Sequence, residues 1–368
     1  MNQPEIAAPD VEPAGRATAR IRLSGVADDR ILLRAAAELT RDIQQPKPLL
    51  YWSDFLASAA AGYAALAGAI LSRSAPIALI CGATAILALY RATLFIHEIT
   101  HLQNGKLPGF RIAWNLVIGI PTLLPSFLYE GIHILHHSRT RYGTIDDPEY
   151  LPLALMRPWT LPVFLILSVL MPAALLLRFA ILAPLSLFSP RLRQVLVARL
   201  SGLQINPRFR RRTPEGAFAR QWLWQELGAS VVGVTVLGSL ASGLLPVRAF
   251  LIAMGVLAGV AVLNQVRTLV AHLWENDGAP LTITAQFLDS TNVPQGFLPL
   301  LWAPVGLRFH ALHHLLPSLP YHSLAEANRR LSRALGRGSV YERASYPTLR
   351  RLVGRLASNT MKRPRHRV

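Results

Sequence analysis

The sequence predicts an all-α integral membrane protein, with two transmembrane helical hairpins, in-plane or re-entrant helices, and a cytosolic helical cap that carries a histidine-rich metal site. Of the 368 residues, 52% are hydrophobic and only 16% are charged, which is typical of membrane proteins. The main apolar stretches come in two pairs, each joined by a short turn. Eight of the eleven histidines lie in three windows of five residues each.

The first predicted hairpin begins near residue 49. Leu49–Leu71 and Pro76–Ile96 are apolar and carry a single charge each, Asp54 and Arg91. Because a hydrocarbon core about 30 Å thick needs roughly 20 helical residues, each stretch is long enough to cross a membrane. We expect them to turn around residues 72–75.

The next part of the chain is apolar but irregular. Gly109–Tyr129 contains an arginine and two prolines, and we expect an in-plane or re-entrant helix there. Leu151–Phe188 contains five prolines and is long for one span but short for two. A strongly basic linker, Pro190–Arg220, precedes the second predicted hairpin, which is formed by Leu227–Leu245 and Ala249–Val266.

Three regions follow from this order: a cytosolic N-terminal segment that is partly disordered (1–48), a membrane domain (49–335), and a basic C-terminal tail (336–368). Within the N-terminal segment, residues 31–43 have the apolar spacing of a helix, and we expect that helix to lie on the membrane surface.

The histidine windows restrict the topology of the chain. If all of them share one metal site, an even number of crossings separates each pair of windows, so Leu151–Phe188 must cross zero times or twice. The windows, the basic linker and the basic tail then lie on one side of the membrane, and the turns of the hairpins lie on the other. Basic loops are favoured in the cytosol. The sequence therefore predicts a bacterial inner-membrane protein whose site faces the cytosol.

Each histidine window has the spacing of one helix face. His97 and His101 stand in HEITH, a second window reads HILHH, and a third reads HALHH. Residues three and four apart lie on the same side of a helix, so each window directs its imidazoles to a common point. A lone buried histidine is usually a hydrogen-bonded packing residue, but three such windows offer up to eight nitrogen ligands, enough for two transition-metal ions. These residues are His97, His101, His133, His136, His137, His310, His313 and His314.

Two metal chemistries compete for these windows. HEITH matches the H-E-x-x-H helix of zinc metalloproteases, in which Glu98 would be the catalytic general base. Zinc, however, takes three protein ligands and a water, which leaves most of the histidines unexplained. A histidine-rich set with few carboxylates is better suited to two iron ions that react with dioxygen, and Glu98 would then orient a ligand imidazole. An intramembrane zinc protease remains the more remote alternative.

Two other site classes are excluded by composition. The single cysteine, Cys81, cannot supply a multi-thiolate metal site or an internal disulfide. The net charge of +18 suggests nucleic acid as a partner, but the arginines flank apolar runs and form no stripe with stacking aromatics. We therefore expect no nucleic-acid partner.

The three windows, their order and their positions after each predicted hairpin resemble the membrane fatty acid desaturases, which carry H-x(3,4)-H, H-x-x-H-H and [HQ]-x-x-H-H. The sequences DDPEY at Asp146–Tyr150 and HHLLPSLPYH around the third window also resemble that family. The resemblance implies a non-haem di-iron enzyme that uses O2 and two electrons to introduce a double bond into an acyl chain, with the eight window histidines as iron ligands. In the stearoyl-CoA desaturase branch a further histidine follows the last span. His272 occupies that place here, and we expect it to be a ninth ligand.

The resemblance also implies partners. The chain lacks a cytochrome b5-like H-P-G-G element and a set of cysteines for an iron–sulfur cluster. We therefore expect a separate electron donor, such as a ferredoxin with its reductase. The expected substrate is a lipid acyl chain, carried as an acyl lipid or an acyl thioester. The same scaffold also supports di-iron hydroxylases of lipid or alkyl substrates, and hydroxylation is the alternative to desaturation.

Overall fold

The computed structural model describes residues 23–102 and 105–361. Within these ranges the chain is helical and forms no strand, only three isolated β-bridges. The predicted all-α membrane fold is confirmed at this level. Five helices are long and apolar enough to cross a membrane: Pro48–Leu71, Ala75–His101, Thr160–Leu185, Gly216–Ala241 and Val247–Ala271.

The first hairpin pairs α2 (Pro48–Leu71) with α3 (Ala75–Thr93). A Cβ atom at Gly62 of α2 would lie 2.7 Å from the side chain of Leu89, so the missing side chain allows the two helices to approach closely. The helical direction continues from α3 into α4 (Phe95–His101), which carries the first histidine window. The window therefore lies at the end of a candidate span.

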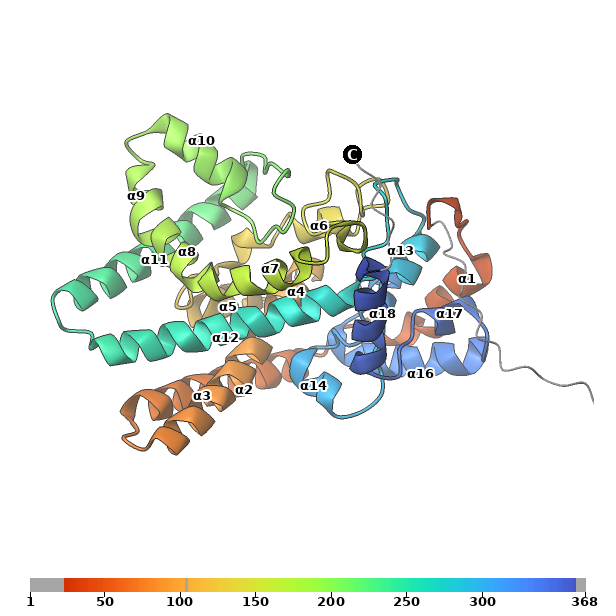
Figure 1. Ribbon diagram of the computed structural model, residues 1–368, viewed down its shortest axis with the longest axis horizontal. Helices are drawn as coiled ribbons and strands as arrows, with labels where there is room; N and C mark the ends of the chain where they lie inside the picture. The colour runs from red at the N-terminus through yellow and green to blue at the C-terminus, as the bar shows by residue number, and fades with distance from the viewer. Residues whose placement is uncertain (1–22, 103–104, 362–368) are drawn as a thin grey trace, which may run out of the picture.

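The second hairpin pairs α11 (Gly216–Ala241) with α12 (Val247–Ala271). Arg248, at the start of α12, donates hydrogen bonds to the carbonyl oxygens of Ile70 and Ser72 at the end of α2. The turns of both hairpins consequently lie together, at the opposite end of the molecule from the cap helices (Figure 1).

Helix α11 begins eleven residues before the apolar stretch expected from the sequence, at Gly216 instead of Leu227. Two of the added residues, Gln225 and Glu226, are polar and buried against other parts of the protein. Gln225 accepts a hydrogen bond from the backbone N–H of Phe127 at 2.9 Å. Glu226 forms an ion pair with Arg178 at 2.7 Å. Hydropathy alone cannot identify such a helix start.

The stretch with five prolines between the hairpins forms one interrupted helical run. It consists of α7 (Thr160–Ile166), a 3₁₀ turn, α8 (Met171–Leu177), a π turn and α9 (Ala183–Leu185), and it packs against α11 and α12. Arg178, in the π turn, also donates from Nε to the carbonyl oxygen of Leu200 at 2.8 Å. This bond fixes the run to the end of α10 (Pro190–Arg199), whose C-cap is Leu200.

A helical cap covers the end of the bundle that carries the histidines. Helix α1 (Arg30–Leu39), which we expected on the membrane surface, instead packs its buried Leu32 and Ala36 in the core cluster that contains α16 (Leu324–Leu335). The cap also contains α17 and α18, and Tyr341 of α17 is buried. The remaining α-helices are α5 (Phe110–Trp114), α6 (His133–His136), α10 (Pro190–Arg199), α13 (Ile283–Asp289), α14 (Leu298–Trp302), α15 (His310–Leu315), α17 (Val340–Arg343) and α18 (Leu349–Met361).

The cap geometry limits how many of the candidate spans cross completely. The Nε2 atoms of His136 and His272 lie 3.2 Å apart, so both residues stand at the same membrane face. Three candidate spans separate them in sequence, and three full crossings would put them on opposite faces. At least one of the three therefore does not cross. Of the three, the run Thr160–Leu185 is interrupted, whereas the two helices of the second hairpin are continuous.

We expect the interrupted run to be the helix that does not cross fully. Topology reporters inserted in the 242–246 turn or the 72–74 turn should then report one side of the membrane, and reporters in 212–215 or at the C-terminus should report the other. Cysteine accessibility at the same positions checks the reporters. A reporter in 212–215 that reads the same side as the hairpin turns would contradict this topology.

Candidate metal centre

Three short helices deliver the histidine windows to one place. His97 and His101 lie on α4, and the third window lies on α15. The second window lies on α6, a helix of only four residues with His137 as its C-cap. Gly131 precedes α6 with φ of 74°, a left-handed conformation that suits glycine and turns the chain into this window.

The nine predicted ligand residues gather into two groups. In each group the candidate ligand atoms all lie within 4.8 Å of one another. The five-histidine cluster takes residues from all three windows, and the four-histidine cluster takes residues from two windows and adds His272. The first group is His97, His101, His133, His137 and His313, and the second is His136, His272, His310 and His314.

His272 therefore completes a group instead of adding to a complete one. An even division of the eight window residues between two ions would be four and four, with His272 as an extra. The structure divides them five and three, and His272 is the fourth member of the smaller group. It is the C-cap of α12 and is 3% exposed. The two groups differ in number and in surroundings.

The spacing of the ring nitrogens fits metal binding. In the four-histidine cluster, Nε2 of His272 lies 3.2 Å from Nε2 of His136 and 3.0 Å from Nε2 of His310. In the five-histidine cluster, Nε2 of His137 lies 3.0 Å from Nε2 of His133 and 3.2 Å from that of His313. Nitrogens about 2.1 Å from one transition-metal ion are roughly 3 Å apart when they bind it at right angles.

The charge state of the rings also fits metal binding. Burial lowers the pKa of His133, His137 and His272 well below the ordinary value, and it does the same for the third window, His310, His313 and His314. A neutral imidazole keeps one nitrogen lone pair, which is the form that binds a metal.

Three further rings bear on this fit. Burial also acts to lower the pKa of His136, but the nearby carboxylates, Asp147 first among them, outweigh it and raise that pKa. The Nε2 atoms of His97 and His101 are buried and have no hydrogen-bond partner among the described residues. Buried polar atoms without a partner are rare, and a metal ion would satisfy these two.

Carboxylates hold the outer nitrogen of two rings in the second window. Nδ1 of His133 lies 3.1 Å from Glu149, and Nδ1 of His136 lies 2.9 Å from Asp147. A carboxylate that accepts from Nδ1–H leaves the Nε2 lone pair free for a metal. Both acids belong to the DDPEY sequence, which the sequence analysis noted without assigning a role. Burial raises the pKa of Glu149 to about 7.

A tyrosine holds His272 in the same way, and sequence reasoning missed it. The hydroxyl of Tyr142 lies 2.9 Å from Nδ1 of His272 and donates to Asp289 at 3.0 Å. The proton order that satisfies every atom runs from His272 Nδ1–H to Tyr142 and from the tyrosine O–H to Asp289. Tyr150 also donates to Asp289, at 2.6 Å. One sequence feature could have pointed to this contact: Asp289 is the last residue of α13 and the only charged residue in that helix.

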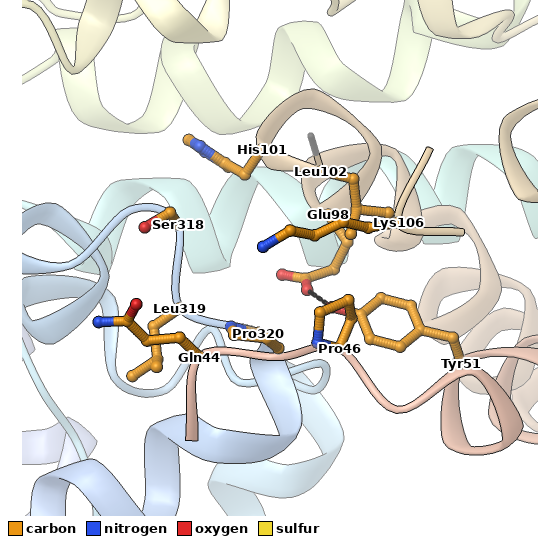
Figure 2. A pocket seen from close by; sticks show the side chains of 10 residues that line it. All are labelled: Gln44, Pro46, Tyr51, Glu98, His101, Leu102, Lys106, Ser318, Leu319 and Pro320. Carbon is orange, nitrogen blue, oxygen red and sulfur yellow. Dashed lines mark hydrogen bonds between the residues drawn. The ribbon is translucent and has the colours of Figure 1, made fainter. Parts of the chain in front are cut away.

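Glu98 stands beside the cluster but contacts other groups. Its carboxylate accepts from the hydroxyl of Tyr51 at 2.5 Å and from the backbone N–H of Tyr321 at 3.1 Å. Its Oε1 lies 3.7 Å from Nδ1 of His97, too far for a hydrogen bond. We expected Glu98 to orient a ligand ring directly, and in the structure it does not. Figure 2 shows Glu98 and Tyr51 meeting in a pocket of about 60 Å³ that His101 also lines.

The comparisons with known proteins agree with this arrangement. The family model described as "Fatty acid desaturase" matches residues 71–346, a range that contains all nine histidines. The chain belongs to the fatty acid desaturase family. A relative named "Ceramide hydroxylase", from Caulobacter vibrioides (strain NA1000 / CB15N), is 45% identical over 335 residues, which cover 91% of this chain and 95% of the relative. No solved structure matches the chain significantly.

Membership of the fatty acid desaturase family confirms the resemblance drawn from the three windows. It also removes the motivation for the zinc protease alternative, because that alternative rested on HEITH alone. In the structure, both histidines of HEITH lie in the five-histidine cluster with residues from the other two windows.

Replacing His272 by alanine tests its place in the four-histidine cluster. The variant should lose one of two bound metal ions and its activity, because only three imidazoles would remain in that group. Metal content by mass spectrometry is the measurement. His322→Ala, a histidine outside both clusters whose Nε2 accepts from the backbone N–H of Lys47, is the control. Unchanged metal content in His272→Ala would give this residue a structural role.

Tyr142→Phe tests the hydrogen bond to His272. We expect metal to be retained less tightly, by about 10- to 100-fold, the usual effect of removing a group that orients a ligand. Metal retention against a chelator measures this. Tyr341→Phe is a matched control, because this tyrosine is also buried but bonds to Asn328 in the cap. Equal retention in the two variants would count against the orienting role.

Proposed function

We propose that this chain is an O2-dependent membrane hydroxylase that inserts a hydroxyl group into ceramide or a closely related lipid. The observation that carries the proposal is the relative named "Ceramide hydroxylase", whose 45% identity extends over nearly the whole of both chains. The sequence alone favours desaturation, with hydroxylation as the alternative. Family membership supports the coarser statement common to both, a lipid-modifying oxidoreductase of the membrane.

The nine clustered histidines are the proposed ligands of two iron ions. The five-histidine cluster would hold one ion and the four-histidine cluster the other. Their nitrogen-rich surroundings are suited to iron, as they are to several divalent transition metals. When bound, the two ions activate O2 and supply the oxidising power to break an unactivated C–H bond.

The protein's own residues hold and shield this chemistry. Glu149, Asp147 and Tyr142 fix three rings through their Nδ1 atoms. Each of the seven clustered histidines other than His101 and His137 is 5% exposed or less, so bulk water is kept from the reacting centre. Selectivity for one carbon of a uniform chain must come from the shape of the lipid path, because methylenes have no polar handle.

Hydroxylation follows a fixed balance: R–H, O2, two electrons and two protons give R–OH and water. The two electrons must come from a partner, and we propose a separate donor such as a ferredoxin with its reductase. We further propose a bacterial inner membrane with the histidine site towards the cytosol, where such donors are found. The basic linker between α9 and α11 supports this orientation.

Desaturation is the second candidate, and the description of the matched family favours it. Its balance is –CH2–CH2–, O2, two electrons and two protons giving –CH=CH– and two waters. Both reactions begin with loss of hydrogen from an unactivated carbon and need the same ligands. They differ in where the oxygen atoms of O2 end up, so labelling the O2 with ¹⁸O distinguishes the two reactions.

Incubation with ¹⁸O2, an electron donor and ceramide in bilayers should yield a lipid that gains one ¹⁸O atom. Mass spectrometry of the extracted lipid measures it. His313→Ala should abolish the product because it removes a member of the five-histidine cluster, while His322→Ala should retain it. A product lighter by two hydrogens and free of ¹⁸O would instead establish desaturation.

A further inference from the structure

Helix α14 presents an apolar face without a partner among the described residues. The face comprises Phe297, which precedes the helix, and three leucines within it. A single exposed leucine is ordinary on any protein surface, but here four of five successive residues are large, apolar and exposed, while Pro299 alone is buried. The exposed fractions are 69% for Phe297, 68% for Leu298, 42% for Leu300 and 38% for Leu301.

The position of α14 relates this face to the spans. The hydroxyl of Tyr90, near the end of α3, donates to the carbonyl oxygen of Trp302 at 2.9 Å. Helix α14 also contacts α12. In Figure 1 it lies beside the spans at the point where they meet the cap. The face therefore stands at the level where the candidate spans leave the hydrocarbon.

The composition of this segment differs from that of other cap surfaces. Residues 294–303 read PQGFLPLLWA and contain no charge. Phenylalanine, leucine and tryptophan are the residues that enter the boundary between headgroups and acyl chains. Helix α16, in contrast, buries Leu331 and exposes Arg329 and Arg333, as a helix facing water does.

We propose that the α14 face is immersed in the acyl–headgroup boundary of the same membrane that α3 and α12 enter. Its occupant is the lipid of that leaflet. Continuity with the spans supports this choice over a second protein, since Tyr90 fixes α14 at their end. Large exposed apolar patches mark interaction sites, and a lipid surface needs no further partner. This inference goes beyond the proposed function and does not depend on it.

The contact would anchor the edge of the cap that carries the third histidine window. The chain runs from α14 to α15, which begins at His310. Asn292, just before this segment, forms β-bridges with both Phe309 and Ser345. The loop between Asn292 and Phe309 is therefore joined at its two ends, and α14 forms its tip.

The single native cysteine makes a direct test simple. In a Cys81→Ser background, Leu298→Cys carries a fluorescent probe in lipid nanodiscs, and Phe297→Cys provides a second position. Leu87→Cys, near the middle of the candidate span Ala75–His101, where the leucine is 39% exposed, is the lipid-facing control. Ala334→Cys, on the exposed surface of α16, is the water-facing control. The quenchers are aqueous iodide and phospholipids that carry a nitroxide at a shallow or a deep acyl carbon.

Both α14 probes should be quenched by the shallow nitroxide lipid and protected from iodide several-fold relative to Ala334→Cys. Leu87→Cys should respond most to the deep nitroxide. Iodide quenching equal to that at Ala334→Cys would overturn the proposal, because the face would then lie in water. Protection from iodide and from both lipids would also overturn it, since the face would be covered by another protein or a second copy.

Discussion

The need to bring nine imidazoles from distant parts of one chain to two adjacent points governs this structure. Seven of them are almost completely buried, and burial keeps most of those rings neutral, so their lone pairs are concentrated in one small space. Concentrating so many acceptors costs free energy unless something binds them. Both hairpins, the interrupted helical run and the cap are consistent with this requirement, because each histidine must reach the same membrane face.

The surroundings of the two clusters are not equivalent. His133 and His136, in different clusters, are each backed by a carboxylate, whereas His272 is backed by the phenol of Tyr142. A phenol is a weaker acceptor than a carboxylate, so the ring it holds is less electron-rich. Together with the five-to-four division of the rings, this gives the two positions different donor strengths, and two metals in them would differ in reactivity.

Much of this arrangement was predictable from the sequence, for specific reasons. Helical spacing within each window determined which rings share a face, and the two span pairs determined on which side they lie. His272 was found only by resemblance, because no spacing rule links it to a window 38 residues away. Tyr142 and Asp289 were missed, since a lone tyrosine or aspartate carries no periodic signal. The direct contact expected between Glu98 and a ligand ring is absent because Tyr51 and the backbone of Tyr321 engage its carboxylate. The start of α11 was missed because Gln225 and Glu226 are satisfied by protein.

The interleaving of the windows has a consequence for how the protein is made. His136 and His137 are adjacent in sequence but belong to different clusters, and each cluster also requires a residue of α15. Chains are synthesised from the N-terminus at about 5–20 residues per second, so both hairpins are made before the last ring. The five-histidine cluster is complete only when His313 has left the ribosome, and the four-histidine cluster only when His314 has. Both sites can therefore be complete only after α15 has been made, and a nascent chain truncated before α15 would hold two partial sites.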